Sequence, residues 1–402
     1  MFTLWAFILI GRPQDLIPGL TAIRPAFLLT IITFGFTFFS TRTLQLSELF
    51  KIKEVKLYTF FYLIMVLGIP FAYHRQVAFD FIFFNYLINI LFFYILLLQV
   101  DSFERLKRFL TILLICSLFY SVFSLFLGAF SQGRFFTYGS VFDPNDIAYV
   151  LISLFPLSLF YVVRNNGILK RILAIATIGA SIPVILLSGS RGGLLGLITV
   201  FLLIFFTRMG SLKFFYKLLI LLSIIVIANS YREQINIDRY LTMTEVSEDY
   251  NMTDESGRLQ IWKRGLELFF SNPITGVGVN CFSMAIGYLR GELFLIPMWQ
   301  APHNSYLQIA VETGIIGFVI FILIIYRTLK NFADCRKLKT LSEKAQELAA
   351  IAGLFEIGFI GQIIAAFFLS QGYSLFFMLF FALSIITKKL YDKLLNENEE
   401  RV

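Results

Sequence analysis

The stretch APHNSYLQIAVETGIIGFVIFILIIY, residues 301–326, decides what kind of protein this is. Residues 304–326 contain one charged side chain, Glu312, and the second half of the stretch is apolar throughout. A helix over 304–326 would be about 34 Å long at 1.5 Å per residue, enough to cross a hydrocarbon core of about 30 Å. The stretch therefore predicts a transmembrane helix that begins with polar residues.

The rest of the chain has the same character. It has 402 residues, of which 58% are hydrophobic and only 15% are charged, against about 25% charged residues in soluble domains. We predict an all-α integral membrane protein with about 12 transmembrane helices. The first segment is the weakest, because it is continuously apolar only to Ile10, and it lacks the features of a signal peptide. The predicted segments are 1–17, 25–40, 56–73, 79–99, 107–128, 146–163, 168–187, 191–208, 212–229, 304–326, 347–367 and 372–387.

Basic residues orient these segments. Of the 34 Lys and Arg residues, 23 fall in one alternating set of loops and tails and 11 in the other. Because cytoplasmic loops are enriched in Lys and Arg, the larger set is predicted to be cytoplasmic, with both termini inside. The net charge of +8 is thus mostly an orientation signal, and it requires no nucleic acid partner.

The smaller, outer set is chemically unusual, because ten of its 11 basic residues are Arg. A guanidinium group binds phosphate through two-point contacts and stays charged in a poorly hydrated site. The alternative is that Arg serves only as an interfacial anchor.

Cys116, Cys281 and Cys335 are predicted to lie in different environments, so we expect no disulfide. No Cys/His cluster indicates a metal site.

One long segment separates the first nine predicted helices from the last three. We divide the chain into helices at 1–229, an outward loop at 230–302, and helices with a cytoplasmic tail at 303–402. The loop begins with an acidic stretch at 245–255. From Ser256 it reads as an amphipathic helix ending at Asn272-Pro273, which we expect to lie on the membrane surface or to cap the bundle. Its predicted apolar face consists of Leu259, Trp262, Leu266, Phe269 and Phe270.

Polar residues mark the entrance of the 304–326 helix. Asn304, Ser305, Gln308 and Glu312 share one face at helical spacing. On an ideal helix His303 would point about 180° away from Glu312, so the two would not form a dyad. The simple interpretation is an interfacial His, a capping Asn and a packed polar stripe, but a carboxylate at this depth generally needs a partner or a role.

Three further motifs are predicted to lie on the same outer side. In Ser188-Gly189-Ser190-Arg191-Gly192-Gly193, small residues and a helix start favour an anion, or simply form a tight packed turn. Arg258 begins the amphipathic helix and could face a phosphate or solvent. Asp143, in Phe142-Asp143-Pro144-Asn145-Asp146, is an ordinary turn and cap residue. A base, two cations and an outer loop on one side describe a site for a phosphorylated lipid.

These motifs resemble the O-antigen ligase and polymerase superfamily of bacterial membrane proteins. The matching pieces are the 188–193 motif, Ser256-Gly257-Arg258 with Trp262, Gly276-Val277-Gly278, and His303-Asn304 through Glu312, Gly314 and Gly317. The resemblance implies transfer of a glycan from undecaprenyl diphosphate to an acceptor on the periplasmic face of the bacterial inner membrane, with no cofactor, nucleotide sugar or metal.

The resemblance also implies roles for individual residues. His303 would be the catalytic base on the acceptor hydroxyl, and Arg191 and Arg258 would bind the diphosphate. Asn304, Glu312, Ser190 and Asp143 are possible supporting residues. A neutral imidazole can take up a proton at neutral pH, and direct displacement at the anomeric carbon would invert its configuration.

Several functions are compatible with these motifs. The leading one is a ligase that attaches O-antigen or a similar surface polysaccharide to lipid A-core. A polymerase would use the same donor with a second lipid-linked repeat as acceptor, and a protein O-oligosaccharyltransferase is a third possibility. A lipid-linked glycan flippase or exporter would account for 12 helices but not for a His and two Arg on one side. An ion-coupled transporter needs midplane ionisable groups, and the only clear ones here are Glu312 and Glu356.

Overall fold

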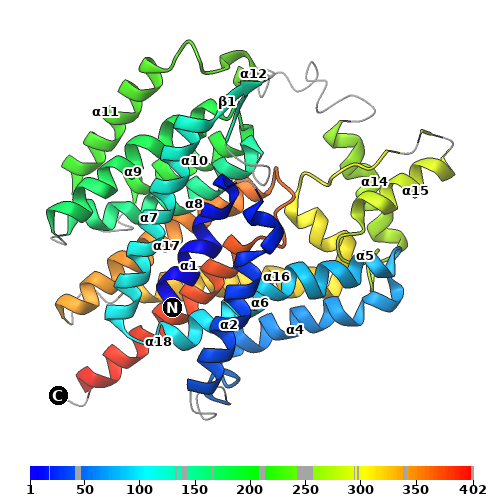
Figure 1. The fold of residues 1–402 in the computed structure, drawn as a ribbon, viewed down its shortest axis with the longest axis horizontal. Helices are drawn as coiled ribbons and strands as arrows, with labels where there is room; N and C mark the ends of the chain where they lie inside the picture. Colours follow the sequence, from blue (N-terminus) through cyan, green and yellow to red (C-terminus); the bar gives the residue numbers. More distant parts are fainter. Residues whose placement is uncertain are drawn as a thin grey trace.

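The computed structural model describes residues 1–17, 19–40, 47–131, 134–137, 143–164, 167–207, 213–241, 257–293, 295–296, 298–337 and 342–399. These residues are mostly helical (Figure 1). The acidic stretch at 245–255 and Ser256 lie outside the described residues. The α-helices are α1 Phe2–Gly11, α2 Pro25–Ser40, α4 Lys53–Leu67, α5 Arg75–Asp80, α6 Leu87–Gln99, α7 Phe103–Leu127, α8 Pro144–Val163, α9 Ile168–Leu187, α10 Arg191–Phe206, α11 Phe214–Ser230, α12 Ile237–Leu241, α14 Arg258–Ser271, α15 Phe282–Glu292, α16 Ser305–Cys335, α17 Glu343–Ala366 and α18 Leu375–Glu399.

Short elements complete the chain. Three 3-10 turns lie at η1 Pro13–Leu16, η2 Leu20–Ile23 and η3 Ile69–Phe71. A π-helical segment, η4 Phe81–Tyr86, joins α5 to α6 in one continuous rod. An antiparallel hairpin pairs β1 Ala129–Ser131 with β2 Arg134–Phe136.

Each of the 12 predicted apolar segments contains a helix, which confirms an all-α membrane architecture. Eight described helical segments are long and apolar enough to cross a membrane, while α1, α10 and α11 are apolar but shorter. Helix α1 ends at Gly11, because Arg12 adopts a left-handed conformation. Helix α18 is apolar only until Lys388 and Lys389. The count of 12 spans remains a prediction.

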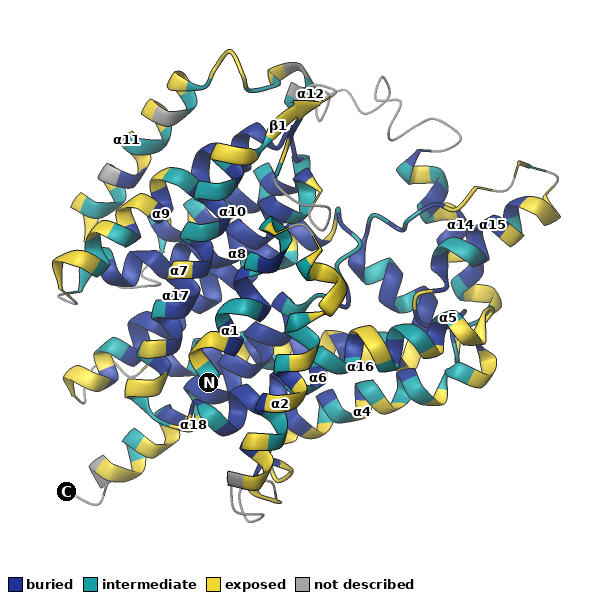
Figure 2. Cartoon of the chain, viewed as in Figure 1, coloured by how far each residue is buried: buried dark blue, intermediate teal, exposed yellow. Residues whose placement is uncertain are grey.

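Helices α8 and α17 form the centre of the bundle and are the most thoroughly buried of the long helices (Figure 2). Helix α17 packs against α8 and α10. Gly196 and Gly361 let the backbones of α10 and α17 approach closely, as small residues do between membrane helices. The Gln362 amide donates to the Tyr149 hydroxyl at 2.6 Å, which adds a polar link between α17 and α8.

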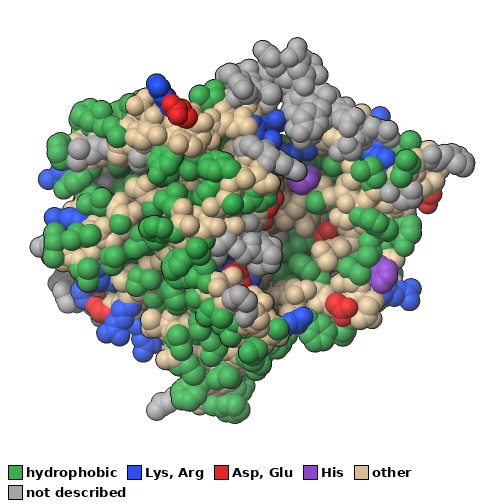
Figure 3. All heavy atoms as spheres, turned by 45° about the horizontal axis from the view of Figure 1, so that its top comes forward, with side chains coloured by type: hydrophobic (Ala, Val, Ile, Leu, Met, Phe, Trp, Pro, Cys, Tyr) green, Lys and Arg blue, Asp and Glu red, His purple; other side chains and the backbone are tan. Residues whose placement is uncertain are grey.

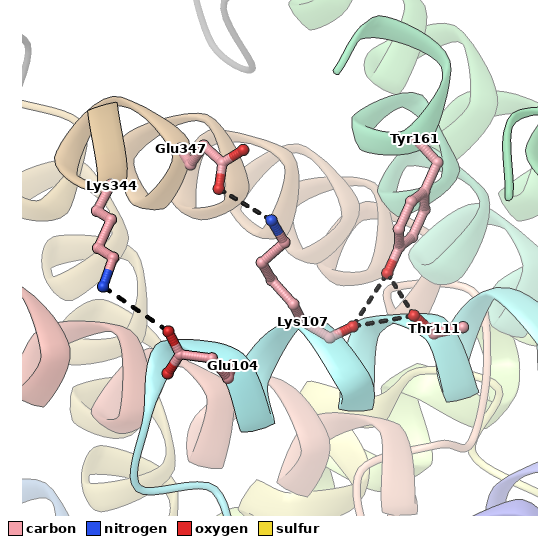
Figure 4. Close-up of polar contacts among 6 residues, drawn as sticks. All are labelled: Glu104, Lys107, Thr111, Tyr161, Lys344 and Glu347. Carbon is pink, nitrogen blue, oxygen red and sulfur yellow. Dashed lines mark hydrogen bonds and ion pairs between the residues drawn. The ribbon is translucent and has the colours of Figure 1, made fainter. Parts of the chain in front are cut away.

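Ion pairs join α7 and α17 at one end of the bundle (Figure 4). The Lys107 Nζ lies 3.1 Å from Glu347 Oε2, and the Lys344 Nζ lies 3.8 Å from Glu104 Oε1. The Tyr161 hydroxyl of α8 donates to the Lys107 carbonyl at 3.1 Å. These four charged residues lie at or near the first turn of their helices, where they would reach the water phase.

Helices α14 and α15 lie on the opposite side of the molecule from α9 and α11 (Figure 1). The predicted amphipathic helix is confirmed as α14, which ends at Ser271 with Asn272 as its C-cap. It packs through Ile261, Gly265 and Leu268. Leu259, Leu266 and Phe270 of the predicted apolar face are exposed, as an element that contacts lipid would require.

The α16 helix is broken at Gly314, although its sequence reads as one continuous span. Gly314 has φ +66° and ψ −173°. The Ile315 N–H donates to the Pro273 carbonyl at 2.8 Å, whereas an unbroken helix would direct it to Val311. The freed Val311 carbonyl accepts from Val277 N–H at 2.8 Å, and the Glu312 carbonyl accepts from Gly278 N–H at 3.2 Å. Residues 273–278 thus replace the missing intrahelical bonds.

Two glycines permit this insertion. A Cβ at Gly314 would overlap the Ile274 carbonyl, and one at Gly276 would overlap the Glu312 backbone. Both glycines also have positive φ, which side chains with a Cβ rarely adopt. The Gly276-Val277-Gly278 motif and Gly314, distant in sequence, are therefore two halves of one contact.

We predict that Gly314→Ala destabilises the protein by about 2 kcal/mol or more, from backbone strain and the clash together. The measurement is thermal unfolding of the full chain in detergent. Gly35→Ala in α2 is the matched control, because a Cβ there meets no atom within 4 Å. Equal melting temperatures for the two variants would contradict the interlocked arrangement.

Candidate active site

A cavity of about 300 Å³ opens where the starts of α8, α10 and α14 meet the residues before α16. Figure 3 shows a hollow on this face, with Lys or Arg side chains and a His beside it. It brings together four predicted site residues: His303, Arg191, Arg258 and Asp143. The other lining residues are Arg134, Asn145, Gly192, Arg239, Gly257, Ile261 and Phe368.

Arg191 is the first residue of α10, and a tight turn presents it. Ser190 is the N-cap, and its hydroxyl accepts from Gly193 N–H at 3.1 Å. Gly189 adopts φ +62°. Gly192 and Gly193 press against Phe368 and Ala148. The sequence left open whether this motif is a tight packed turn or part of an anion site. Its glycines pack the helix closely, and its Arg lines the cavity, so both descriptions apply.

Arg134 and Arg239 also line the cavity and contact the same turn. Arg134 Nε donates to the Ser188 carbonyl at 3.2 Å, and its Nη2 donates to Asn145 Oδ1 at 2.9 Å. Arg239 Nε donates to the Gly189 carbonyl at 2.9 Å. Arg191 Nε in turn donates to the Arg239 carbonyl at 3.2 Å. The turn thus fixes three guanidinium groups around one space.

The electrostatics of the cavity favour an anion. Among its described lining residues, four guanidinium groups face a single carboxylate, that of Asp143. Burial, together with the charges of Arg239 and Arg258, lowers the pKa of Arg134 to about 10. That value still leaves the side chain charged at pH 7. A multiply charged anion would relieve this repulsion between cations.

His303 precedes α16, which begins at Ser305, so the ideal-helix estimate of its direction does not apply to it. Its backbone is left-handed, with φ +44°, an uncommon conformation for a residue with a side chain and one often found at functional sites. Burial and the charge of Arg258 lower the pKa of His303 to about 4, against a smaller opposing effect of Asp143. The imidazole is therefore neutral at pH 7.

Contacts from two sides hold the backbone at His303. The His303 N–H donates to Ser370 Oγ at 2.9 Å. The Trp262 indole of α14 donates to the Pro302 carbonyl at 3.0 Å. Ser305 Oγ donates to the Leu369 carbonyl at 2.7 Å and clips the same loop to the start of α16. The α17–α18 connection and α14 together position the imidazole.

The remaining predicted residues have structural contacts outside the cavity lining. Asn304 caps α16, with its Oδ1 accepting from Tyr306 and Leu307 N–H at 3.0 Å each. Gln308 Oε1 accepts from Gly372 N–H at 3.2 Å. The polar stripe therefore packs against neighbouring segments, as the simpler interpretation held.

Glu312 pairs with backbone amides. Its Oε2 accepts from Asn280 N–H at 2.8 Å, and its Oε1 accepts from Phe282 N–H at 3.2 Å. Both amides belong to the start of α15, where a negative charge also meets the positive end of the helix. Glu312 is buried, with 2% exposure. It anchors the 273–282 segment in the break of α16, so its position favours a structural role.

Asp143 caps a helix and also lines the cavity. Its Oδ1 accepts from Asn145 N–H at 2.6 Å and Asp146 N–H at 2.9 Å, forming a capping box at the start of α8. It also lines the cavity.

Sequence reasoning missed Arg134 and Arg239, although both belong to the Arg-rich outer set. The excess of Arg in that set was the signal that could have identified them.

Comparisons with known proteins agree with the family resemblance. Residues 176–322 match the family described as O-antigen ligase. A protein of Rickettsia conorii named "Putative polysaccharide ligase" is 32% identical over 133 residues, 31% of this chain and 31% of that protein. A protein of Rickettsia typhi with the same description is 31% identical over 157 residues, 37% of this chain and 36% of that protein. The chain matches about a third of the length of these relatives.

The matched segment contains three of the four predicted site residues that line the cavity, Arg191, Arg258 and His303, and also the two halves of the α16 contact. Arg134 and Asp143 precede it. The resemblance drawn from the sequence is thereby confirmed over residues 176–322, the segment of this chain that matches the O-antigen ligase family.

Proposed function

We propose that the cavity transfers a glycan from undecaprenyl diphosphate to lipid A-core or a similar surface acceptor. The observation that carries this proposal is the convergence of four arginines and a neutral histidine on one cavity of about 300 Å³. The family match and the names of the relatives support a polysaccharide ligase over a flippase.

The arginines bind the donor diphosphate in this proposal. Arg191 and Arg258 line the cavity from the starts of α10 and α14, and Arg134 and Arg239 line it as well. Guanidinium groups form bidentate hydrogen bonds to phosphate oxygens and stabilise negative charge as it develops on the leaving diphosphate. Four guanidinium groups can supply this compensation without a metal ion.

His303 accepts the proton of the acceptor hydroxyl. The acceptor oxygen attacks the anomeric carbon as the bond from that carbon to the diphosphate oxygen breaks. The proton passes to the imidazole, and the electron pair leaves with the diphosphate. A single displacement of this kind inverts the anomeric configuration. The bound diphosphate offsets the charge of Arg258, so it raises the basicity of His303 when the donor is present.

We further propose the placement of the chain in the bacterial inner membrane. It has about 12 spans, both termini are cytoplasmic, and the 230–302 loop with the cavity faces the periplasm. The division of Lys and Arg between loops supports this orientation. The donor lipid would then enter from the bilayer, and the acceptor would enter from the aqueous side.

We predict that His303→Ala lowers glycan transfer by a factor of about 10² to 10⁴, the usual contribution of a general base, while donor binding is retained. The assay combines purified protein, lipid-linked oligosaccharide and lipid A-core, with and without EDTA. His74→Ala is the matched control, because His74 is the only other histidine and caps α5, outside the cavity lining.

The length of the products in this assay shows whether the acceptor is lipid A-core or a second lipid-linked repeat. A single addition to lipid A-core supports a ligase, and a ladder of products on the lipid carrier indicates a polymerase. Full activity of the His303→Ala protein would exclude the base assignment, and a strict metal requirement would contradict charge compensation by arginine.

The pH dependence of kcat/KM provides a second prediction. A base acts when unprotonated, so the rate should fall as pH drops through the pKa of His303, which is about 4. Arg258 lowers that pKa, so Arg258→Gln should shift the acid limb to higher pH as well as reduce the rate. Arg75→Gln, outside the cavity lining, should leave the profile unchanged. If the acid limb of the pH profile does not shift in the Arg258→Gln protein, His303 is not the group whose titration produces that limb.

A further inference from the structure

A second charged site lies at the other end of α16. Lys330 is 25 residues beyond Ser305, about 37 Å along the helix, so this end is far from the catalytic cavity. The start of α4, the end of α16 and the basic part of α18 meet here around a pocket of about 420 Å³. We refer to it as the basic pocket. Its cations are Lys53, Arg327, Lys330, Lys388 and Lys389.

Several of these cations have no acidic partner within the pocket. Lys388 pairs with Asp392. Glu54 and Asp334 also line the pocket, so five cations face three carboxylates, and Asp334 pairs with Lys337 outside the pocket at 2.9 Å. Among the described residues, no ion pair engages Lys53, Arg327, Lys330 or Lys389. The pocket therefore keeps an excess of positive charge for a ligand.

An apolar groove of about 620 Å³ continues from the same place along α4. Lys53 and Arg327 line both the basic pocket and this groove. Beyond them the groove is bordered by Phe50, Leu57, Phe60 and Leu63, and Phe60 and Leu63 are 48% and 47% exposed. The basic pocket thus opens directly onto the apolar groove.

We propose that these joined surfaces bind an anionic phospholipid of the bilayer, with its phosphate group in the basic pocket and an acyl chain along the apolar groove. Basic pockets between membrane helices on the cytoplasmic side are suited to anionic headgroups. The two surfaces meet at Lys53 and Arg327, as the glycerol region of a lipid would require. A soluble polyanion would use the basic pocket but gain nothing from the groove.

This site would tie together α4, α16 and α18, three helices from distant parts of the sequence. Helix α16 packs against both α4 and α18. A bound lipid would screen the repulsion among the lysines and cover the exposed groove, so it would stabilise the bundle. The inference does not depend on the glycan transferred at the other end.

The test measures lipid retention by the full-length protein in detergent, using native mass spectrometry after equilibration with phosphatidylglycerol or phosphatidylethanolamine. The wild type should retain phosphatidylglycerol in preference. Lys53→Gln/Arg327→Gln should weaken its retention about thirtyfold, because each basic residue near an anionic lipid contributes about a factor of five. Leu63→Trp, which fills the groove, should also weaken it while leaving the charges in place.

The matched control is Arg105→Gln/Lys344→Gln, which removes two exposed cations near the starts of α7 and α17. This control should retain phosphatidylglycerol like the wild type. Equal retention of both lipids by the wild type would overturn the proposal, as would unchanged retention by Lys53→Gln/Arg327→Gln. Displacement of the lipid by equimolar inorganic pyrophosphate, with no effect of Leu63→Trp, would assign the pocket to a soluble polyanion instead.

Discussion

The break in α16 at Gly314 links the membrane bundle to the elements that carry the cavity. Residues 273–278 donate and accept the backbone hydrogen bonds that the broken helix leaves open, and Glu312 binds the amides at the start of α15. Helix α14, which carries Arg258 and Trp262, immediately precedes this inserted segment and packs against α16. Trp262 then binds the Pro302 carbonyl next to His303. Through α14, the backbone contact at the break is thus connected to the segment that carries His303.

The cavity places positively charged side chains close together, an arrangement that the stability of the fold does not require. Four guanidinium groups around about 300 Å³ repel one another, and burial of Arg134 adds to the cost. Backbone carbonyls of Ser188, Gly189 and Arg239 accept hydrogen bonds from three of these side chains, those of Arg134, Arg239 and Arg191. Such preorganised charge is characteristic of sites that stabilise an anion as it forms. The pKa of His303 is lowered for a related reason, since burial and the charge of Arg258 disfavour the imidazolium.

Much of the architecture could be predicted from the apolar runs, because a lipid-exposed backbone must satisfy its own hydrogen bonds as helix. All 12 runs contain helices, and α14 begins and ends within two residues of the prediction. The break in α16 could not be predicted, since Gly314 lies within a stretch that reads as one continuous span and its partner segment is 36 to 41 residues away in sequence. The left-handed conformation of His303 escaped prediction too, because the loop at 369–372 imposes it. Arg134 and Arg239 lie in segments without periodicity, and only the fold brings them to Arg191.

The central claim is that the arginine cavity holds the diphosphate of a lipid-linked glycan, and an experimental structure of the protein with such a donor tests it most directly. The account predicts phosphate oxygens within hydrogen-bonding distance of Arg191 and Arg258, with the anomeric carbon facing the His303 imidazole. A diphosphate bound elsewhere, with the cavity unoccupied, would contradict it.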